Sequence, residues 1–191
     1  WRRTRKLSHR CSRIRRRPDG MTAQRIVVLG GGQLGRMMGL AGIPLGLRFR
    51  FLDPSAEACA SQVGELLQAP FDDADAASSL AAGADVTTFD FENVPDSSAR
   101  AVEAICPLYP PSQALGACQD RLQEKRLLES LDIAVGGYHP VSSRTDLLAG
   151  LQKLGYPAVL KTRRLGYDGK GQVVLRDQED LERAWQKLGD A

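Results

Sequence analysis

The stretch IVVLGGGQLG, residues 26–35, decides the fold class of this chain. Four consecutive apolar residues predict a short buried strand, three glycines predict a tight turn, and helical character follows at 33–41. The same alternation continues along the chain, with expected strands at 48–52, 65–69 and 86–91 and expected helices at 72–82 and 97–105. It predicts an α/β domain at about residues 24–110, Rossmann-like, with a parallel sheet covered by helices on both faces.

A second unit follows a proline-rich boundary. Pro107, Pro110 and Pro111 end the first domain, and residues 111–132 are expected to form linking helices with an interruption near 116–120. Within 133–191 the pattern predicts a helix at 147–154, strands at 157–161 and 172–176, and a helix at 177–188 capped by Asp177. About 60 residues make a poor independent core. We therefore expect this second unit to be a truncated α+β domain.

Composition and charge exclude several classes of protein. With 42% hydrophobic and 26% charged residues the chain is expected to be globular, and no apolar run approaches the length of a membrane span. The net charge of +3 hides a basic segment at 1–20, which holds nine Lys/Arg and one acid. We interpret this segment as a disordered or artefactual tail, with the native protein starting at Met21 and with no nucleic-acid or membrane partner. A nucleic-acid-binding tail remains the alternative.

Cysteine and histidine usage bounds the chemistry. The four cysteines show no C-x-x-C spacing, which is typical of reduced thiols in a cytoplasmic protein. His9 and His139 are the only histidines, so neither a histidine metal site nor a Ser-His-Asp triad is expected. The sequence predicts no metal ligands within these residues.

The first glycine motif, Gly30 to Gly35, fits G-x-G-x-x-G between a strand and a helix. Its glycines let backbone N–H groups approach an anion at a helix start. Asp53 follows Gly32 by about 21 residues, the place of a ribose-binding acid in dinucleotide folds. An NAD-dependent oxidoreductase is therefore one alternative. In the others, the glycines only tighten the packing between strand and helix, and Asp53 only initiates an Asp-Pro turn.

The second glycine motif lies in AVLKTRRLGYDGKGQVVL, residues 158–175. A strand ends in Lys161, a basic loop with glycines at 166, 169 and 171 follows, and a second strand returns. A Walker A loop is excluded because Gly171 follows Lys170 where that motif needs Ser or Thr. Two strands joined in this way can close over a triphosphate, with Lys161 directed at phosphate oxygens. The alternative is a solvated basic hairpin, whereas a dehydrogenase has no need for this feature.

Four segments together resemble the 5-(carboxyamino)imidazole ribonucleotide synthase family of ATP-grasp ligases. They are VVLGGGQLGRMM (27–38), FDFENVP (89–95), QDRLQEKRLLESL (119–131) and YPAVLKTRRLGYDGKGQ (156–172), and the resemblance covers 25–191. It implies a Rossmann-like pre-ATP-grasp domain followed by an incomplete ATP-grasp domain. The family carboxylates 5-aminoimidazole ribonucleotide with bicarbonate and ATP, giving ADP and phosphate in purine biosynthesis. It also implies Mg²⁺, with ligands expected beyond Ala191, and a homodimer at full length.

The resemblance assigns roles to residues that match the family motifs. Asp168 is expected to orient the substrate amine or to accept its proton. The residues expected to bind ATP are Arg121, Lys161, Gly166, Tyr167, Asp168, Gly169, Lys170, Gly171 and Gln172. Those expected to hold the ribonucleotide are Gln33, Leu34, Glu92, Tyr167 and Asp168. For Glu92, capping of the helix near Pro95 is an equal alternative. Because the second lobe of the ATP-grasp fold is absent, the 191 residues are expected to be inactive alone.

Overall fold

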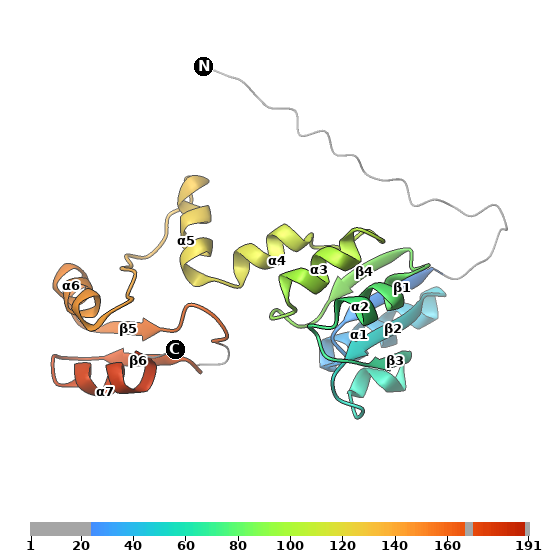
Figure 1. Ribbon diagram of the computed structural model, residues 1–191, viewed down its shortest axis with the longest axis horizontal. Coiled ribbons are helices and arrows are strands. Elements are labelled where there is room, and N and C mark those ends of the chain that lie inside the picture. Colours follow the sequence, from blue (N-terminus) through green and yellow to red (C-terminus); the bar gives the residue numbers. More distant parts are fainter. Residues whose placement is uncertain (1–23, 167–169, 190–191) are drawn as a thin grey trace, which may run out of the picture.

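The computed structural model describes residues 24–166 and 170–189. Figure 1 shows an α/β unit and a smaller hairpin unit, with two helices of the intervening segment between them. The basic segment 1–20 and residues 167–169 lie outside the described residues. Within the described part, no helix has the length and apolar character needed to cross a membrane.

The α/β unit is built on a four-stranded sheet. Its strands are β1 (Arg25–Leu29), β2 (Arg48–Asp53), β3 (Glu65–Gln68) and β4 (Val86–Phe89). They are all parallel and lie in the order β3-β2-β1-β4, with Val28 opposite both Phe51 and Thr88. The predicted parallel sheet is confirmed. Three strand ends in this sheet differ from the prediction: β2 ends one residue later and β3 one residue earlier, while β4 ends at Phe89 and not at Phe91.

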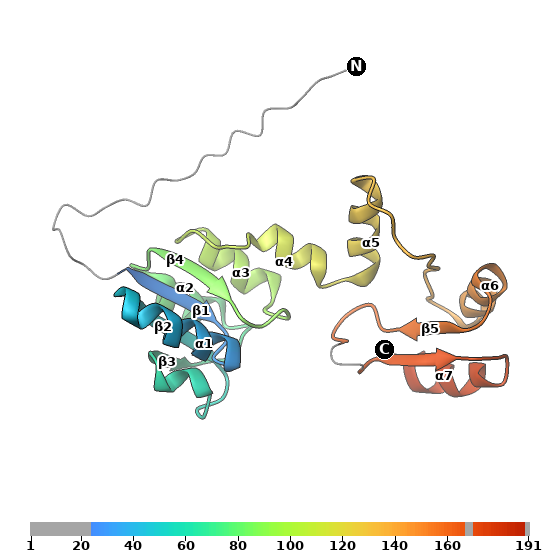
Figure 2. The same ribbon diagram turned by 180° about the vertical axis from the view of Figure 1, so that it is seen from behind.

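Helices cover both faces of this sheet, as the sequence predicted. On one face, α1 (Gln33–Gly42) and the 3₁₀ helix η2 (Cys59–Gln62) enclose a core that includes Val28, Phe51 and Ala60. The opposite face is covered by α2 (Ala74–Ala81) and α3 (Asp96–Glu103). Figure 2 shows α1 in front of the sheet, while α2 lies in front of it in Figure 1. A short 3₁₀ helix, η1 (Ile43–Leu45), follows α1.

Two helices connect the units. They are α4 (Ser112–Cys118) and α5 (Arg121–Ser130), so the predicted interruption is confirmed, at Gln119 and Asp120. Asp120 ends the interruption because its carboxylate accepts hydrogen bonds from the Leu122 and Gln123 amides and caps α5.

The second unit is a β-hairpin packed on two helices. It contains α6 (Arg144–Leu154), β5 (Ala158–Lys161), β6 (Gln172–Leu175) and α7 (Asp180–Leu188), with β5 and β6 antiparallel. Its buried core comes from α6, β6 and α7 and contains Leu147, Leu151, Leu175, Leu181 and Ala184. The described helices therefore cover one face of the hairpin.

Four helix starts differ from the prediction, by one residue at α3 and by two or three residues at α2, α6 and α7. α6 begins at Arg144, because Ser143 caps it, and α2 begins at Ala74, capped by Asp73. Asp177 is not the cap of α7, which begins at Asp180. The Asp177 carboxylate instead accepts a hydrogen bond from the Glu179 amide, 2.9 Å away, and so closes a turn before the helix.

Candidate functional site

Protein carboxylates bind the amides of the first glycine motif. The Gly31 amide donates to Asp53 Oδ2 at 2.8 Å, and the Gly32 and Gly35 amides both donate to Asp90 Oδ2 at 2.9 Å. The prediction that the glycine amides approach a bound anion is therefore wrong for these three. The anion that they contact is part of the protein.

Asp90 was missed because the sequence placed it inside a strand. Since β4 ends one residue earlier, the Asp90 side chain turns toward the loop between β1 and α1. Burial raises the pKa of this carboxyl, the Gly35 and Gly32 amides oppose the shift, and the charge of Asp53 adds to it. No spacing rule in the sequence marks Asp90 as a ligand of the glycine loop.

Asp53 also accepts a hydrogen bond from the first glycine motif. Its Oδ1 accepts a hydrogen bond from the Ser55 amide at 2.8 Å, which confirms the interpretation as an Asp-Pro turn initiator. Its Oδ2 is taken by Gly31, so both oxygens are already bonded. Asp53 and Asp90 also place two carboxylates where a dinucleotide pyrophosphate would approach. This arrangement argues against the NAD-dependent oxidoreductase.

The predicted ribonucleotide residues of the first unit lie around the start of α1. Gln33 and Leu34 are its first two residues and are exposed, and no partner of their amides is found among the described residues. Glu92 lies in the turn that follows Asp90 and is also exposed. The alternative role of Glu92 is wrong, because α3 begins after Pro95 without a side-chain cap. Asp90 thus brings the Glu92 segment beside the start of α1.

Lys161 ends β5 on the outer face of the hairpin. The register pairs Lys161 with Gln172 and Val159 with Val174, and all four side chains are exposed. The alternate residues of the two strands face the core of the second unit. Strand alternation therefore places an ammonium group and two exposed valines on the same outer face.

A cavity of about 550 Å³ lies where the loop after β5 meets the start of α5. Its lining residues are Asp120, Thr162, Arg163, Arg164, Leu165 and Gly171. Arg121 joins the two elements, since its amide donates to the Arg163 carbonyl at 3.0 Å and its Nη2 to the Gly166 carbonyl at 3.2 Å. The Thr162 amide donates to the Gly171 carbonyl at 2.8 Å and closes the base of the loop.

Asp120 lies at the centre of these contacts. Arg163 donates to it through Nε at 3.2 Å and through Nη2 at 2.6 Å. Burial acts to raise the pKa of Asp120, but the hydrogen bonds from Arg163, Gln123 and Leu122 outweigh it, so the pKa lies below its usual value. The sequence predicted Arg121, Lys161 and Gly166 but gave Asp120 and Arg163 no role.

The remaining predicted residues are placed as follows. Gln172 begins β6, Lys170 is exposed, and Gly171 has a φ of +67° beside the Thr162 side chain. Tyr167, Asp168 and Gly169 lie outside the described residues, so their predicted roles stay predictions.

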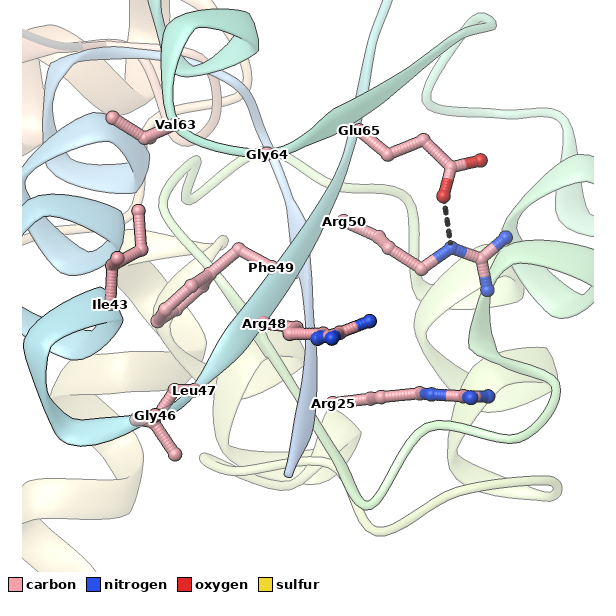
Figure 3. Close-up of a pocket in the computed structure, with 10 residues that line it drawn as sticks. All are labelled: Arg25, Ile43, Gly46, Leu47, Arg48, Phe49, Arg50, Val63, Gly64 and Glu65. Carbon is pink, nitrogen blue, oxygen red and sulfur yellow. Dashed lines mark hydrogen bonds and ion pairs between the residues drawn. The ribbon is translucent and has the colours of Figure 1, made fainter. Parts of the chain in front are cut away.

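A larger cavity, of about 750 Å³, lies in the first unit, at the end of the four-stranded sheet where β1 and β2 begin. This end is opposite the one that leads into the first glycine motif. Figure 3 shows Arg25, Arg48 and Arg50 on one side of β2 and Phe49 with Ile43 on the other. Arg50 is paired with Glu65 at 3.2 Å. None of the residues that the sequence predicted for the site lines this cavity.

Both units match known families. Residues 23–119 match the ribonucleotide synthetase preATP-grasp domain, and residues 126–191 match the ATP-grasp domain. Over 165 residues the chain is 46% identical to N5-carboxyaminoimidazole ribonucleotide synthase of Pseudomonas aeruginosa. The chain belongs to the ribonucleotide synthetase preATP-grasp family. The match includes 86% of this chain and 46% of the Pseudomonas protein, so the chain spans about half the length of that family member.

Solved structures of family members have the same fold. The N5-carboxyaminoimidazole ribonucleotide synthetase of Thermus thermophilus is 51% identical, with a TM-score of 0.78 over 86% of this chain and 44% of that chain. The Aspergillus clavatus synthase, in complex with ADP and 5-aminoimidazole ribonucleotide, is 26% identical, with a TM-score of 0.78 over 88% of this chain and 44% of that chain.

Proposed function

We propose that this chain supplies the pre-ATP-grasp domain and the first part of the ATP-grasp domain of an ATP-dependent carbon–nitrogen ligase. The enzyme would join bicarbonate to the amine of 5-aminoimidazole ribonucleotide and release ADP and phosphate, in purine biosynthesis. The observation that carries the proposal is the hairpin whose outer face presents Lys161 and whose loop is bonded to Arg121. The ligands of the Aspergillus family member, ADP and the ribonucleotide, support it.

The nucleotide would lie on the outer face of the hairpin. Val159 and Val174 offer apolar surface there, with exposures of 49% and 40%, which suits the flat face of a base. Lys161 and Arg121 would bind phosphate oxygens, since ammonium and guanidinium groups form charge-assisted hydrogen bonds with them. Gly166, Gly169, Lys170, Gly171 and Gln172 would close over the phosphates through backbone N–H groups.

The ribonucleotide would lie at the start of α1. The Gln33 and Leu34 amides point from a helix N-terminus, where phosphate groups bind favourably. Asp90 leaves these two amides available, because it takes those of Gly32 and Gly35. Glu92 would contact the ribose, and Tyr167 with Asp168 would meet the aminoimidazole from the hairpin side.

The chemistry proceeds in two transfers. A bicarbonate oxygen attacks the γ-phosphorus of ATP and ADP leaves, giving carboxyphosphate. The substrate amine then attacks the carboxyl carbon, phosphate leaves, and Asp168 accepts the proton from nitrogen. Lys161 and Arg121 would stabilise the charge that develops on the phosphates.

Mg²⁺ and the partner subunit belong to the proposal as well. No group of three or more His, Cys, Asp or Glu side chains among the described residues could hold a metal ion. The family resemblance, and not this absence, places the Mg²⁺ ligands outside these residues, because one or two carboxylates with phosphate oxygens are enough to hold Mg²⁺. We also propose a homodimer for the full-length protein. A cytoplasmic location fits Cys59, Cys106 and Cys118, which are free thiols.

The test uses the product of the complete open reading frame that contains these 191 residues. Phosphate release from ATP should require both bicarbonate and 5-aminoimidazole ribonucleotide. Lys161→Ala should lower kcat/KM about 100-fold, as loss of one transition-state charge contact does elsewhere. Lys187→Ala, in the last turn of α7, is the matched control. Phosphate release that does not depend on bicarbonate or on the ribonucleotide would contradict the proposal. Equal effects of Lys161→Ala and Lys187→Ala on kcat/KM would contradict it as well.

A further inference from the structure

We propose that Asp120 is a positioning residue, which fixes the loop after β5 against α5 and so aligns Arg121 with Lys161. The inference rests on the proposed function, because this alignment matters for a reaction only if both cations bind one nucleotide. It extends that function to a residue that touches neither nucleotide nor substrate.

Asp120 serves two groups of donors. Its Oδ1 accepts from the Leu122 and Gln123 amides at 3.0 and 3.3 Å, which caps α5. The carboxylate also accepts two hydrogen bonds from Arg163 and lies 3.5 Å from Nε of Arg164. A helix cap needs only a neutral acceptor, since Asn caps as well as Asp. The negative charge is therefore used for the arginines of the loop.

Because Asp120 is buried, its carboxylate needs a cationic partner. Asp120 is 3% exposed, and no other charged residue that the structure describes is buried. A carboxylate in such a place is destabilising unless cations and hydrogen-bond donors surround it. Arg163 meets the need with two bonds from one planar guanidinium, which also fixes the orientation of the loop backbone.

The clamp formed by Asp120 and Arg163 determines where Arg121 lies. Arg121 follows Asp120 in the chain, and its amide is bonded to the carbonyl of Arg163, the residue that Asp120 holds. Lys161 is the last residue of β5 and lies two residues before Arg163 in the chain. Figures 1 and 2 both show the loop after β5 beside the junction of α4 and α5. Two cations from distant parts of the chain are thus kept in a fixed relation, which lowers the entropy cost of binding one ligand between them.

The first measurement is amide hydrogen exchange by NMR on the 191-residue chain. Asp120→Asn keeps the cap acceptor but turns an amide group toward the Arg163 donors. Loss of the charged hydrogen bond between Arg163 and Asp120 frees the Arg163 backbone, whose carbonyl accepts from the Arg121 amide. The Arg121 amide should therefore exchange about tenfold faster or more, while the Leu122 and Gln123 amides keep their rates. Asp146→Asn, which alters a carboxylate at the start of α6, should leave Arg121 unchanged.

The second measurement is steady-state kinetics on the product of the complete reading frame. Asp120→Asn should raise the KM for ATP about tenfold and change kcat little, because binding geometry is lost and not a reacting group. Arg163→Gln should have the same effect, and the double variant should be no worse than either single one. A general loss of structure would lower kcat as well.

Three results would overturn the inference: unchanged exchange at Arg121, unchanged KM in Asp120→Asn, or additive effects in the double variant. Failure of the proposed function looks different. In that case the wild-type protein shows no dependence on bicarbonate and ribonucleotide, while the exchange measurement still decides whether Asp120 holds the loop.

Discussion

Gly30→Ala tests whether the contact between Asp90 and the glycine loop stabilises the α/β unit. Gly30 has a φ of +117°, and a Cβ added there would lie 1.5 Å from Asp90 Oδ1. The Asp90 side chain must therefore leave its place. Its Oδ2 would lose the hydrogen bonds from the Gly32 and Gly35 amides, each 2.9 Å long.

The expected cost follows from these contacts. Hydrogen bonds to a charged acceptor contribute about 1.5 to 3 kcal/mol each, and a positive φ costs alanine about 1 to 2 kcal/mol. Because Asp90 is half-buried and can be rehydrated when displaced, we expect the lower end, about 4 kcal/mol. Gly46→Ala is the control, since Gly46 has a φ of +80° with nothing within 4 Å of the added Cβ. It should cost only about 1 kcal/mol.

The assay follows alkylation of Cys106 in increasing urea, read by mass spectrometry. Cys106 is 3% exposed in the core beneath α3 and reacts only when that unit unfolds. Trp185 fluorescence reports the second unit and should not change. In Asp90→Ala the added methyl group meets no carboxylate, so Gly30→Ala should cost less in that background. Equal costs for Gly30→Ala and Gly46→Ala in the wild-type background would refute the reasoning.

Two further variants test the electrostatics and the packing. Because burial raises the pKa of Asp90 above its usual 3.8, the stability that the protonated form adds is full below that pH and is lost as pH rises through the folded pKa. As the pH rises above about 4, the wild type should lose unfolding free energy relative to Asp90→Asn, and parallel pH profiles would contradict this. Leu175→Ala removes a side chain that is 1% exposed and should cost the second unit about 2 to 5 kcal/mol by urea titration of Trp185 fluorescence. Val174→Ala, on the outer face, should cost under about 1 kcal/mol, and a similar cost for both would show that the core is not where the structure places it.

Local sequence patterns encode much of the fold, so most of its elements could be predicted from the sequence. The strands of the sheet, the helices on both faces and the break before α5 follow from hydrophobic periodicity and from residues such as Asp120 that end or begin helices. Errors occurred where two local signals competed. Asp177 suited both a helix cap and a turn, and β4 ended before an aspartate that the apolar pattern included.

The candidate site divides in the same way. The second glycine motif predicted a role for Lys161, since a motif places backbone and charge by spacing along the chain. The family resemblance predicted roles for Arg121 and the first residues of α1, and all of these roles stay predictions. The partners of those groups were not found. Asp90 binds Gly32 across 58 residues and Asp120 binds Arg163 across 43, and no local pattern records either pair.

The sequence alone determined the α/β architecture, the two glycine motifs and the family resemblance, because each depends on residue order over short stretches. The tertiary structure decided that carboxylates occupy the first glycine loop and that a buried aspartate holds the second. A hydrogen bond forms between whichever donor and acceptor the fold brings within about 3 Å, and that proximity belongs to the packed chain as a whole.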